Sequence, residues 1–331
     1  MRTIRWGIIG CGNVTEVKSG PAFQQARHSA LVAVMRRTGK LARDYAERHG
    51  VPKWYDDADA LIQDPEIDAV YIATPPSSHR EYALRVAAAG KPVYVEKPMA
   101  RTIQECEQMI DACRAAGVPL FVAYYRRALP RFLKVKELID GGAIGAVRSV
   151  DIMYREPAPA SLRAATELPW RVRPEISGGG LFLDLGSHML DFLDFALGPI
   201  DQASGLAANQ AGLYPAEDIV TGAFRFASGA LGVGTWCFTT GDRRDWTEII
   251  GTRGRIGYVT FESSPIVLET AAGRHEFAIE DPLHIQQPLI QSIVDALNGS
   301  SGAPSTGESG ARTSWVMDAL LGSRGASPLR D

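Results

Sequence analysis

The sequence opens with a short apolar run that leads into two glycines, and this pattern restricts the fold more than any other feature of the chain. Residues 4–9 are nearly all apolar, and Gly10 and Gly12 follow at once, ahead of a segment predicted to be helical. In a dinucleotide-binding unit the first glycine permits a tight turn and the second lets the backbone approach a pyrophosphate. The N–H groups of Asn13 and Val14, at the helix start, would meet the phosphate charge. The turn predicts a dinucleotide-binding domain.

Further short apolar runs predict the rest of this domain. Strands are expected at residues 4–9, 31–35, 69–73, 92–95 and 120–123. Helices are expected between them at residues 40–49, 80–89 and 103–116. Strands that are apolar at nearly every position belong to a parallel sheet covered by helices on both faces. We therefore expect residues 1–125 to form a doubly wound α/β domain of the Rossmann type.

The pattern changes after residue 125. A helix is expected at residues 129–139, followed by strands at 147–154, 220–226, 230–238, 246–250 and 257–261. Successive strands without a helix between them are typical of an antiparallel sheet. Two terminal helices, at 285–297 and 311–321, flank a Gly/Ser/Pro-rich stretch at 299–310 that is typical of a surface connection. Residues 126–331 are therefore expected to form an α+β domain with a largely antiparallel sheet.

Composition excludes several classes of protein. The chain has 331 residues, with 35 Lys and Arg against 38 Asp and Glu, so no basic surface for nucleic acid is indicated. No apolar run reaches the ~20 residues that a membrane helix needs. The four cysteines are dispersed without a C-x-x-C pair, and no His, Cys and carboxylate set has the spacing of metal ligands. We predict a cytoplasmic protein with a small-molecule partner and no metal.

The residues after the second predicted strand indicate which dinucleotide is bound. An acidic residue about 20 positions beyond the glycine motif would bind the adenosine ribose of NAD. Arg36 and Arg37 stand there instead, and a guanidinium suits a 2′-phosphate as a carboxylate does not. The sequence therefore favours NADP over NAD. The alternative is a pair of solvated arginines on a loop.

The turn after the third predicted strand also lies where ligands of open α/β sheets bind. The strand at residues 69–73 leads into a polar turn whose candidate cofactor contacts are Thr74, Pro75, Pro76 and His79. Serine and threonine in this turn can instead cap the next helix. For His79, packing at the start of that helix is an equal alternative to ligand contact.

Two later motifs carry a family resemblance. Glu96-Lys97-Pro98 follows the fourth predicted strand, and residues 178–191 read Gly-Gly-Gly-Leu-Phe-Leu-Asp-Leu-Gly-Ser-His-Met-Leu-Asp. In this order behind the glycine turn, the motifs resemble those of the glucose-fructose oxidoreductase, inositol dehydrogenase and MocA family, over nearly the whole chain. The resemblance implies an N-terminal Rossmann domain, a C-terminal domain with an open sheet, and a nicotinamide cofactor held between them.

The resemblance also implies roles for individual residues. The family's catalytic positions correspond to Lys97, Asp184 and His188, and Glu96 and Lys97 are expected to border the cofactor. The dipeptide Trp170-Arg171 is similar to a pair that touches the cofactor in some NADP-dependent sugar-ketone reductases of the family; a core indole beside a surface guanidinium is the alternative. The chain departs from the family pattern at Thr15, where a small residue is usual, and at His284, where many members have a tyrosine.

The helical segment at residues 182–196 suggests the chemistry. If it is one α-helix, Asp184, His188 and Asp191 share one stripe of an otherwise apolar helix, which must face a cleft or find buried partners. We expect a cleft. An imidazole with a pKa of about 6.5 can act as acid or base, Asp184 can orient substrate or imidazole, and Lys97 can polarise the reacting oxygen. The roles of His188 and Lys97 can be exchanged, and an intrahelical Asp–His pair is the structural alternative.

These observations predict an NADP-dependent oxidoreductase that transfers hydride between nicotinamide and a small polyhydroxylated or cyclic carbonyl or alcohol, such as a sugar, polyol or diol. One alternative is a regulatory protein that binds dinucleotide without turnover, which the retained Lys97, Asp184 and His188 disfavour. Another is an NAD-assisted glycosidase, which Arg36 and Arg37 disfavour. The family resemblance also implies that the C-terminal domain binds substrate and forms a homodimer or tetramer through its sheet, since an open sheet tends to pair with another copy.

Overall fold

The computed structural model describes residues 1–160, 162, 167–300 and 302–322. These residues form two compact units. The first unit comprises Met1–Ala100, Gln104–Leu129 and Pro282–Gly310. The second comprises Arg101–Ile103, Pro130–Asp281 and the described residues from Ala311 onward. The first unit therefore includes a segment from near the end of the chain.

The first unit is built on a parallel sheet of six strands in the order β3-β2-β1-β4-β5-β6. The strands are β1 (Ile4–Ile9), β2 (Ser29–Met35), β3 (Lys53–Tyr55), β4 (Ala69–Ile72), β5 (Val93–Val95) and β6 (Leu120–Val122). Every residue of β4 and β5 is buried, as expected for strands covered on both faces. The five predicted strands are all present, the predicted Rossmann class is confirmed, and β3 is an additional edge strand.

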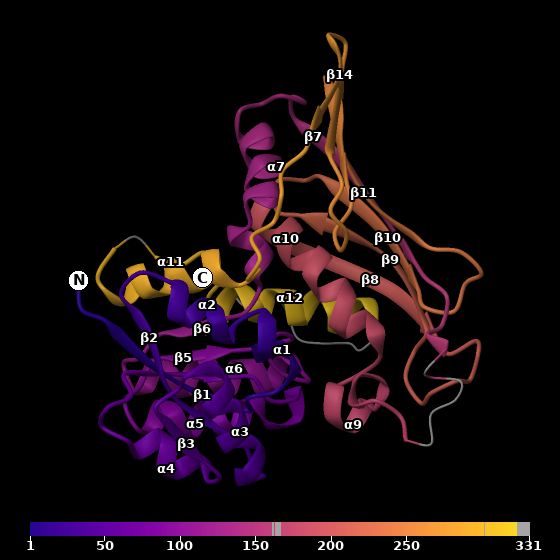
Figure 1. Cartoon of the computed structure of the whole chain (residues 1–331). Helices are drawn as coiled ribbons and strands as arrows, with labels where there is room; N and C mark the ends of the chain where they lie inside the picture. The colour runs from indigo at the N-terminus through magenta and orange to yellow at the C-terminus, as the bar shows by residue number, and fades with distance from the viewer. Residues whose placement is uncertain (161, 163–166, 301, 323–331) are drawn as a thin grey trace. The chain divides into compact units, whose positions relative to one another are not determined.

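Helices cover this sheet (Figure 1). They are α1 (Asn13–Val17), α2 (Gly20–Gln25), α3 (Gly39–His49), α4 (Ala58–Gln63), α5 (His79–Ala88), α6 (Ile103–Ala115) and α11 (Gln287–Leu297). Residues 40–49, 80–89 and 103–116 are thus helical almost as predicted. The helix α4 was not predicted, because its six residues are too few to give a clear periodic pattern.

The end of the chain also covers the open edge of the first sheet. The stretch at residues 299–310 was predicted to be a surface connection, but Ser305 within it is fully buried. Ser305 Oγ donates to the carbonyl of Val122 at 2.8 Å, the amide of Val122 donates to the carbonyl of Ser305 at 3.3 Å, and Thr306 forms a bridge with Phe121. The prediction was wrong at these positions because β6 is an edge strand whose polar backbone groups need partners.

The second unit is built on an eight-stranded sheet in the order β14-β13-β12-β11-β7-β10-β9-β8. The strands are β7 (Val147–Arg155), β8 (Ile200–Ala208), β9 (Ile219–Phe226), β10 (Leu231–Cys237), β11 (Arg244–Gly251), β12 (Gly254–Tyr258), β13 (Ile266–Thr270) and β14 (Gly273–Phe277). Only β7 and β10 pair in parallel; the other neighbouring pairs are antiparallel. The predicted α+β class with a largely antiparallel sheet is confirmed.

One face of this sheet is buried and the other is exposed. Figure 1 shows α7 (Pro130–Asp140) and α10 (Ser187–Leu197) on the same side of the sheet. The ring of Phe192 in α10 lies 4.8 Å from that of Phe132 in α7 and 5.7 Å from that of Tyr258 in β12. On the exposed side, the strands keep apolar residues such as Leu206 and Val233 in contact with solvent. The core of the unit therefore lies between the sheet and these two helices.

One predicted strand of the second unit is displaced. Residues 257–261 were expected as a strand, but β12 spans Gly254–Tyr258. The amides of Thr260 and Phe261 do not continue the ladder, because both donate to Oδ2 of Asp245, at 2.9 and 2.7 Å. The buried carboxylate of Asp245 thus ends the strand earlier than the apolar pattern indicated.

The remaining helices of the second unit are short α9 (Pro174–Ser177) and long α12 (Gly307–Leu320). The first turn of α12 belongs to the first unit and the rest to the second. In the part of the chain that the structure describes, no helix combines the length and apolar character needed to cross a membrane.

Candidate functional site

Four groups of predicted cofactor residues follow four neighbouring strands of the first sheet. The carboxyl ends of parallel strands share one edge, and here the strands are β2, β1, β4 and β5. Backbone hydrogen bonds continue the ladder past the strand ends, from Gly10 N to Met35 O (2.9 Å) and from Glu96 N to Ile72 O (2.9 Å). The structure therefore brings the glycine turn, Arg36, the Thr74 turn and the Glu96-Lys97 pair to one sheet edge.

The glycine turn has the shape that a pyrophosphate requires. Gly10 has a φ of +93°, and a Cβ there would lie 2.7 Å from Cγ2 of Thr74. A Cβ on Gly12 would meet only the Gly10 carbonyl, at 3.8 Å, so the space in front of Gly12 is open. The amides of Asn13 and Val14 belong to the first turn of α1, where no carbonyl of the same helix can accept from them. These groups fit a dinucleotide phosphate.

Thr15, the departure from the family pattern, is fully buried and closes the turn. Its Oγ1 accepts from Gly12 N (3.0 Å) and donates to Gly12 O (2.8 Å). The close packing that a small residue would give occurs instead at Gly20, where a Cβ would lie 2.1 Å from the Tyr45 hydroxyl. α1 ends at Val17, and a separate helix, α2, begins at Gly20.

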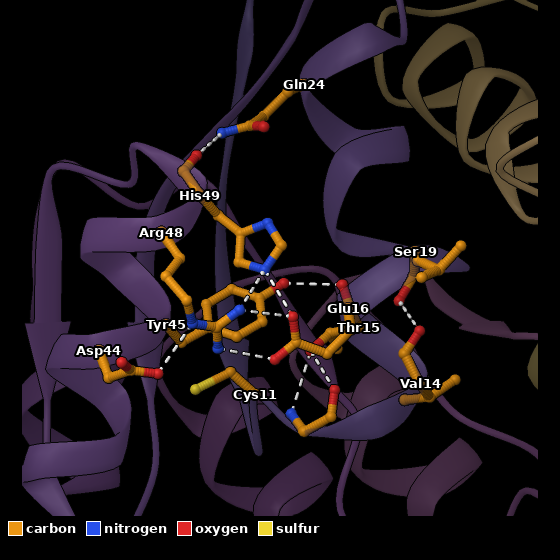
Figure 2. Close-up of polar contacts among 12 residues, drawn as sticks. Cys11, Val14, Thr15, Glu16, Ser19, Gln24, Asp44, Tyr45, Arg48 and His49 are labelled. Carbon is orange, nitrogen blue, oxygen red and sulfur yellow. Dashed lines mark hydrogen bonds and ion pairs between the residues drawn. The ribbon is translucent and has the colours of Figure 1, made fainter.

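A charged cluster ties α1 to α3 beside the turn. Figure 2 shows Arg48 and His49 of α3 directed toward Glu16 of α1. Arg48 donates to both carboxylate oxygens of Glu16 at 2.8 Å, and His49 Nε2 lies 2.7 Å from Oε2. The hydrogen bonds from Arg48 lower the pKa of Glu16 to about 2. The negative charge of Glu16, on the helix that follows the glycine turn, is therefore paired, which favours an anionic ligand there.

Arg36 and Arg37 are exposed where β2 ends. Nη1 of Arg36 lies 3.5 Å from the carbonyl of Cys11. Cys11 is the residue between the two glycines of the turn. The residues directly after β2 read Arg-Arg-Thr-Gly-Lys and include no carboxylate. A guanidinium thus lies beside the turn on the side where the adenosine half of a dinucleotide binds in a Rossmann unit.

The turn after β4 is connected to the lysine turn by His79. The imidazole is fully buried, with Nε2 2.7 Å from the carbonyl of Thr74 and Nδ1 3.1 Å from the carbonyl of Pro98. Burial lowers the pKa of His79. Pro75 and Pro76 occupy the turn between Thr74 and His79. The imidazole therefore contacts main-chain carbonyls of two adjacent turns, and the structure brings Thr74 and Lys97-Pro98 close together.

The predicted helix at residues 182–196 is not a single α-helix. Residues Phe182–Gly186 form a π-helical turn, and α10 begins at Ser187. A Cβ on Gly186 would lie 2.6 Å from the ring of Phe182, so the turn depends on that glycine. π-helical turns occur often at functional sites. Asp184 lies within this turn, and its spacing to His188 is therefore not that of a regular α-helix.

Asp184 is joined to the predicted cofactor-contacting pair. Nε of Arg171 donates to Oδ2 of Asp184 at 3.0 Å, and the guanidinium carbon of Arg171 lies 4.4 Å from the ring centroid of Trp170. The side chain of Asp184 is 19% exposed and that of Arg171 is 49% exposed. The structure thus brings three of the predicted residues of the second unit together.

Asp191 does not belong to the expected stripe toward a cleft. Asp191 is fully buried and accepts a hydrogen bond from Thr313 Oγ1 at 3.2 Å. His188 is 4% exposed, and its ring lies 6.1 Å from that of Phe261, edge to face. Asp191 is therefore a buried polar group with a partner in α12, and the expectation that all three groups face one cleft was wrong for it.

The glycine run before the π-helical turn is explained by two close contacts. Gly178 has a φ of +90°, and a Cβ there would lie 2.7 Å from the carbonyl of Arg101. The amide of Gly180 donates to Oε1 of Glu217 at 2.8 Å, and burial raises the pKa of that carboxyl. Nothing in the sequence indicated Glu217, because it lies 37 residues from its partner.

Two family models match most of the chain. Residues 4–124 match the model described as an oxidoreductase family with an NAD-binding Rossmann fold, and residues 132–257 match the C-terminal domain model of the GFO/IDH/MocA family. The chain belongs to this family. It is an NAD(P)-dependent dehydrogenase or reductase, and the predicted resemblance and enzyme class are confirmed.

Individual relatives cover almost the whole chain. Oxidoreductase P35 of Formosa agariphila is 42% identical over 96% of this chain and 98% of its own length. A 1,5-anhydro-D-fructose reductase of Ensifer adhaerens is 30% identical over 92% of each chain. Among solved structures, a levoglucosan dehydrogenase in complex with NADH and levoglucosan is 25% identical, covers 97% of this chain and 96% of its own, and superposes with a TM-score of 0.84. These are similarities to other members of the family.

Proposed function

We propose that the protein is an NADP-dependent oxidoreductase that exchanges hydride with a small polyhydroxylated or cyclic carbonyl or alcohol. The observation that carries the proposal is the position of Lys97 at the sheet edge where the glycine turn lies, two strands from Gly10. The names of two relatives, 1,5-anhydro-D-fructose reductase and levoglucosan dehydrogenase, support a sugar-like substrate.

The preference for NADP rests on Arg36. Its guanidinium is exposed beside the glycine turn, 3.5 Å from the carbonyl of Cys11. A 2′-phosphate there would form charge-assisted hydrogen bonds with Arg36, with Arg37 adjacent. The levoglucosan dehydrogenase structure contains NADH, so the relative and the arginines point to different cofactors. We give the arginines more weight because the residues after β2 supply no carboxylate for the ribose of NAD.

The catalytic roles follow from the chemistry of the side chains. A bound nicotinamide supplies the hydride donor or acceptor. In the reducing direction the substrate oxygen gains negative charge as its carbon gains hydride, and it must receive one proton. We propose that Lys97 and His188 share this task, one donating the proton and the other polarising the oxygen, and that Asp184 orients substrate or imidazole. In the oxidising direction the same group removes the hydroxyl proton.

Trp170 and Arg171 are proposed as cofactor contacts. The guanidinium of Arg171 lies over the indole ring of Trp170, and the ion pair to Asp184 connects the two side chains with a proposed catalytic residue. A change in the position of Arg171 would therefore be transmitted to Asp184 through one hydrogen bond. In this scheme the pair orients both the cofactor and the proposed catalytic carboxylate.

We also propose a homo-oligomer through the exposed face of the second sheet. Leu206 on β8 is 76% exposed, and Leu231 and Val233 on β10, the next strand but one, are 59% and 52% exposed. Leu206 and Val233 line one hollow of that face together with Met153. Contiguous apolar surface of this kind favours burial against a second copy. Light scattering should give a dimer or tetramer that Val233→Glu dissociates; a monomeric wild type would contradict the proposal.

A cytoplasmic location is proposed from the cysteines. Cys11, Cys106, Cys113 and Cys237 are all free and buried, as is typical of proteins in reducing compartments. Fractionation of cells that express the natural chain would test the location. Recovery with an exported fraction would contradict it.

One assay tests the main proposal. NADPH or NADH is added with a panel of sugar ketones, diketones, aldehydes and 1,5-anhydro-D-fructose, and the absorbance of the reduced cofactor is followed. Net oxidation of NADPH, faster than that of NADH, is the expected result. Cofactor binding without oxidation of either nucleotide by any carbonyl would overturn the proposal, and faster oxidation of NADH would overturn its NADP part alone.

A further inference from the structure

A buried network surrounds the glutamate that precedes Lys97. Glu96 is 7% exposed, and its Oε1 accepts from the Tyr71 hydroxyl at 2.5 Å and from Nε2 of Gln286 at 2.7 Å. Its Oε2 accepts from the backbone amide of Lys97 at 3.1 Å. The carboxylate of Glu96 thus joins the start of the lysine turn to two side chains from other segments of the first unit.

Gln286 is fully buried and is held in one orientation. Its Oε1 accepts from the Tyr94 hydroxyl at 3.0 Å while its Nε2 donates to Glu96. A flipped amide would place its oxygen against the Glu96 carboxylate. That contact is unfavourable because both groups are acceptors. The Glu96 carboxylate, which can only accept, therefore fixes the Gln286 amide as a donor, and the Tyr94 hydroxyl supports this orientation by donating to the amide oxygen.

The segment that carries Gln286 also contacts the helix after the glycine turn. The amide of Gln286 donates to the carbonyl of Lys18 at 3.2 Å, and Nδ1 of His284 lies 2.6 Å from the carbonyl of Val17. Val17 and Lys18 end α1, the helix that the glycine turn begins. The segment from His284 to Gln286 therefore connects the end of α1 with the lysine turn.

We propose that Gln286 is a positioning residue for hydride transfer, which holds Glu96 so that Glu96 fixes the backbone from which Lys97 projects. This inference rests on the proposed function, in which Lys97 acts on the reacting oxygen. A small displacement of a reacting group far from the chemistry can cost on the order of 100-fold in rate. Loss of the Gln286 donor should therefore lower kcat more than it weakens nucleotide binding.

The amide-to-carboxyl change at this position gives a distinctive test. In Gln286→Glu, a protonated carboxyl can still donate to Glu96 and accept from Tyr94, but two ionised carboxylates would repel each other. Tyr71, Tyr94 and His79 are the titratable groups that interact electrostatically with Glu96. The charged residue Lys97 follows Glu96 directly in the chain. Burial raises the pKa of both tyrosines well above their usual range, and burial lowers that of His79.

The pH profile of Gln286→Glu should therefore contain a limb that belongs to the carboxyl pair. Activity should be partly retained at mildly acidic pH and should fall as pH rises. The wild type should lack this limb, because an amide does not titrate. A merely structural role for Gln286 would lower thermal stability without producing a new limb in kcat.

The experiment uses the full chain with NADPH and the best carbonyl substrate of the panel. Gln286→Met should lower kcat by about 10- to 100-fold, with the NADPH dissociation constant, measured by fluorescence, changed less than about threefold. Gln291→Met is the matched control, because Gln291 also anchors α11, through Arg27 and Asp295, but does not contact Glu96. It should keep wild-type kcat.

Each outcome decides the inference. If the wild type turns over substrate and Gln286→Met keeps the wild-type kcat, the inference is wrong and the proposed function stands. A pH profile of Gln286→Glu without the new limb has the same consequence. Absence of turnover by the wild type overturns both. If Gln286→Met does not fold, Tyr94→Phe removes only the hydroxyl that orients the amide, and kcat equal to wild type in that variant counts against the inference.

Discussion

The guanidinium of Arg171 donates from Nε to Oδ2 of Asp184 at 3.0 Å, and its central carbon lies 4.4 Å from the centroid of the Trp170 ring. Asp184 lies in a π-helical turn, and Arg171 lies in a short 3₁₀ turn 13 residues earlier. Two segments that the sequence marks separately as cofactor-contacting and catalytic are thus joined by one hydrogen bond. Disturbing either segment should affect the other.

The first prediction concerns this ion pair. Arg171→Met should lower kcat/KM by roughly 10-fold, because Asp184 loses the donor that orients it. The free energy of unfolding should change by less than about 1 kcal/mol, since the pair is partly solvated. Steady-state kinetics and thermal melts would measure both quantities. Arg173→Met is the control, because Arg173 forms a similar pair with Glu175; equal activity losses in the two variants would contradict a specific role.

The second prediction concerns cofactor choice. Arg36→Ala should raise KM for NADPH by between about 10-fold and about 100-fold, which corresponds to loss of a hydrogen bond to a charged group. KM for NADH should stay within about twofold of wild type, since NADH lacks the 2′-phosphate. Arg43→Ala, which removes an exposed arginine paired with Glu47 on α3, should leave both constants unchanged. An equal rise in KM for NADPH and for NADH would argue against recognition of the 2′-phosphate by Arg36.

The third prediction concerns Lys97. Lys97→Met should lower kcat by about 100-fold or more, the range expected when a general acid or base is removed. The dissociation constant of NADPH should change little, because the glycine turn is intact. Nucleotide titration and single-turnover kinetics separate the two effects. Retained turnover in the methionine variant would remove Lys97 from the mechanism.

The fourth prediction concerns pH and stability. Burial raises the pKa of Asp318 to about 6, although the amide of Ile103 donates to it. A carboxyl whose pKa is raised on folding stabilises the fold fully below its unfolded pKa of 3.8, and this contribution is lost as pH rises through 6. Asp318→Asn should therefore raise the free energy of unfolding at pH 8 by on the order of 2 kcal/mol, with no gain at pH 3.5.

Denaturant titrations at the two pH values would check this prediction. The control is Asp140→Asn, at an exposed aspartate of α7 paired with Lys136, where the change should stay within about 0.5 kcal/mol. If Asp318→Asn raised the free energy of unfolding equally at both pH values, or lowered it at pH 8, burial of the ionised Asp318 carboxylate would not be destabilising and the prediction would be wrong.

The fold could be predicted from the sequence where one physical cause dominated. The bounds of β1, Ile4–Ile9, match the prediction because an apolar run ends there at a glycine. The two edge features of the first sheet, β3 and the Ser305 segment, could not be predicted. Strand β3 has three residues, and Ser305 is buried only because β6 lacks a neighbour on one side.

The candidate site was predictable in its local motifs and not in its long-range contacts. The glycine turn and the Lys97 turn follow strands, and the strand order brings them together. The π-helical turn could not be predicted, because the apolar pattern of residues 182–196 is that of an α-helix. The wider turn brings the Phe182 ring so close to Gly186 that a Cβ at position 186 would lie 2.6 Å from it. Gln286 lies 190 residues from Glu96, and no pattern in either segment indicates their contact.

The return of Pro282–Gly310 to the first unit has a consequence for biosynthesis. Domains generally fold as units while the ribosome is still elongating the chain, but this nucleotide-binding unit lacks α11, the Gln286 anchor and the cover of its β6 edge until residues 282–310 have been translated. All strands of the second unit lie between Pro130 and Asp281, so its sheet can be completed first. A truncated product ending at Leu129 would therefore be a target for chaperones and proteases, not an independent binding module.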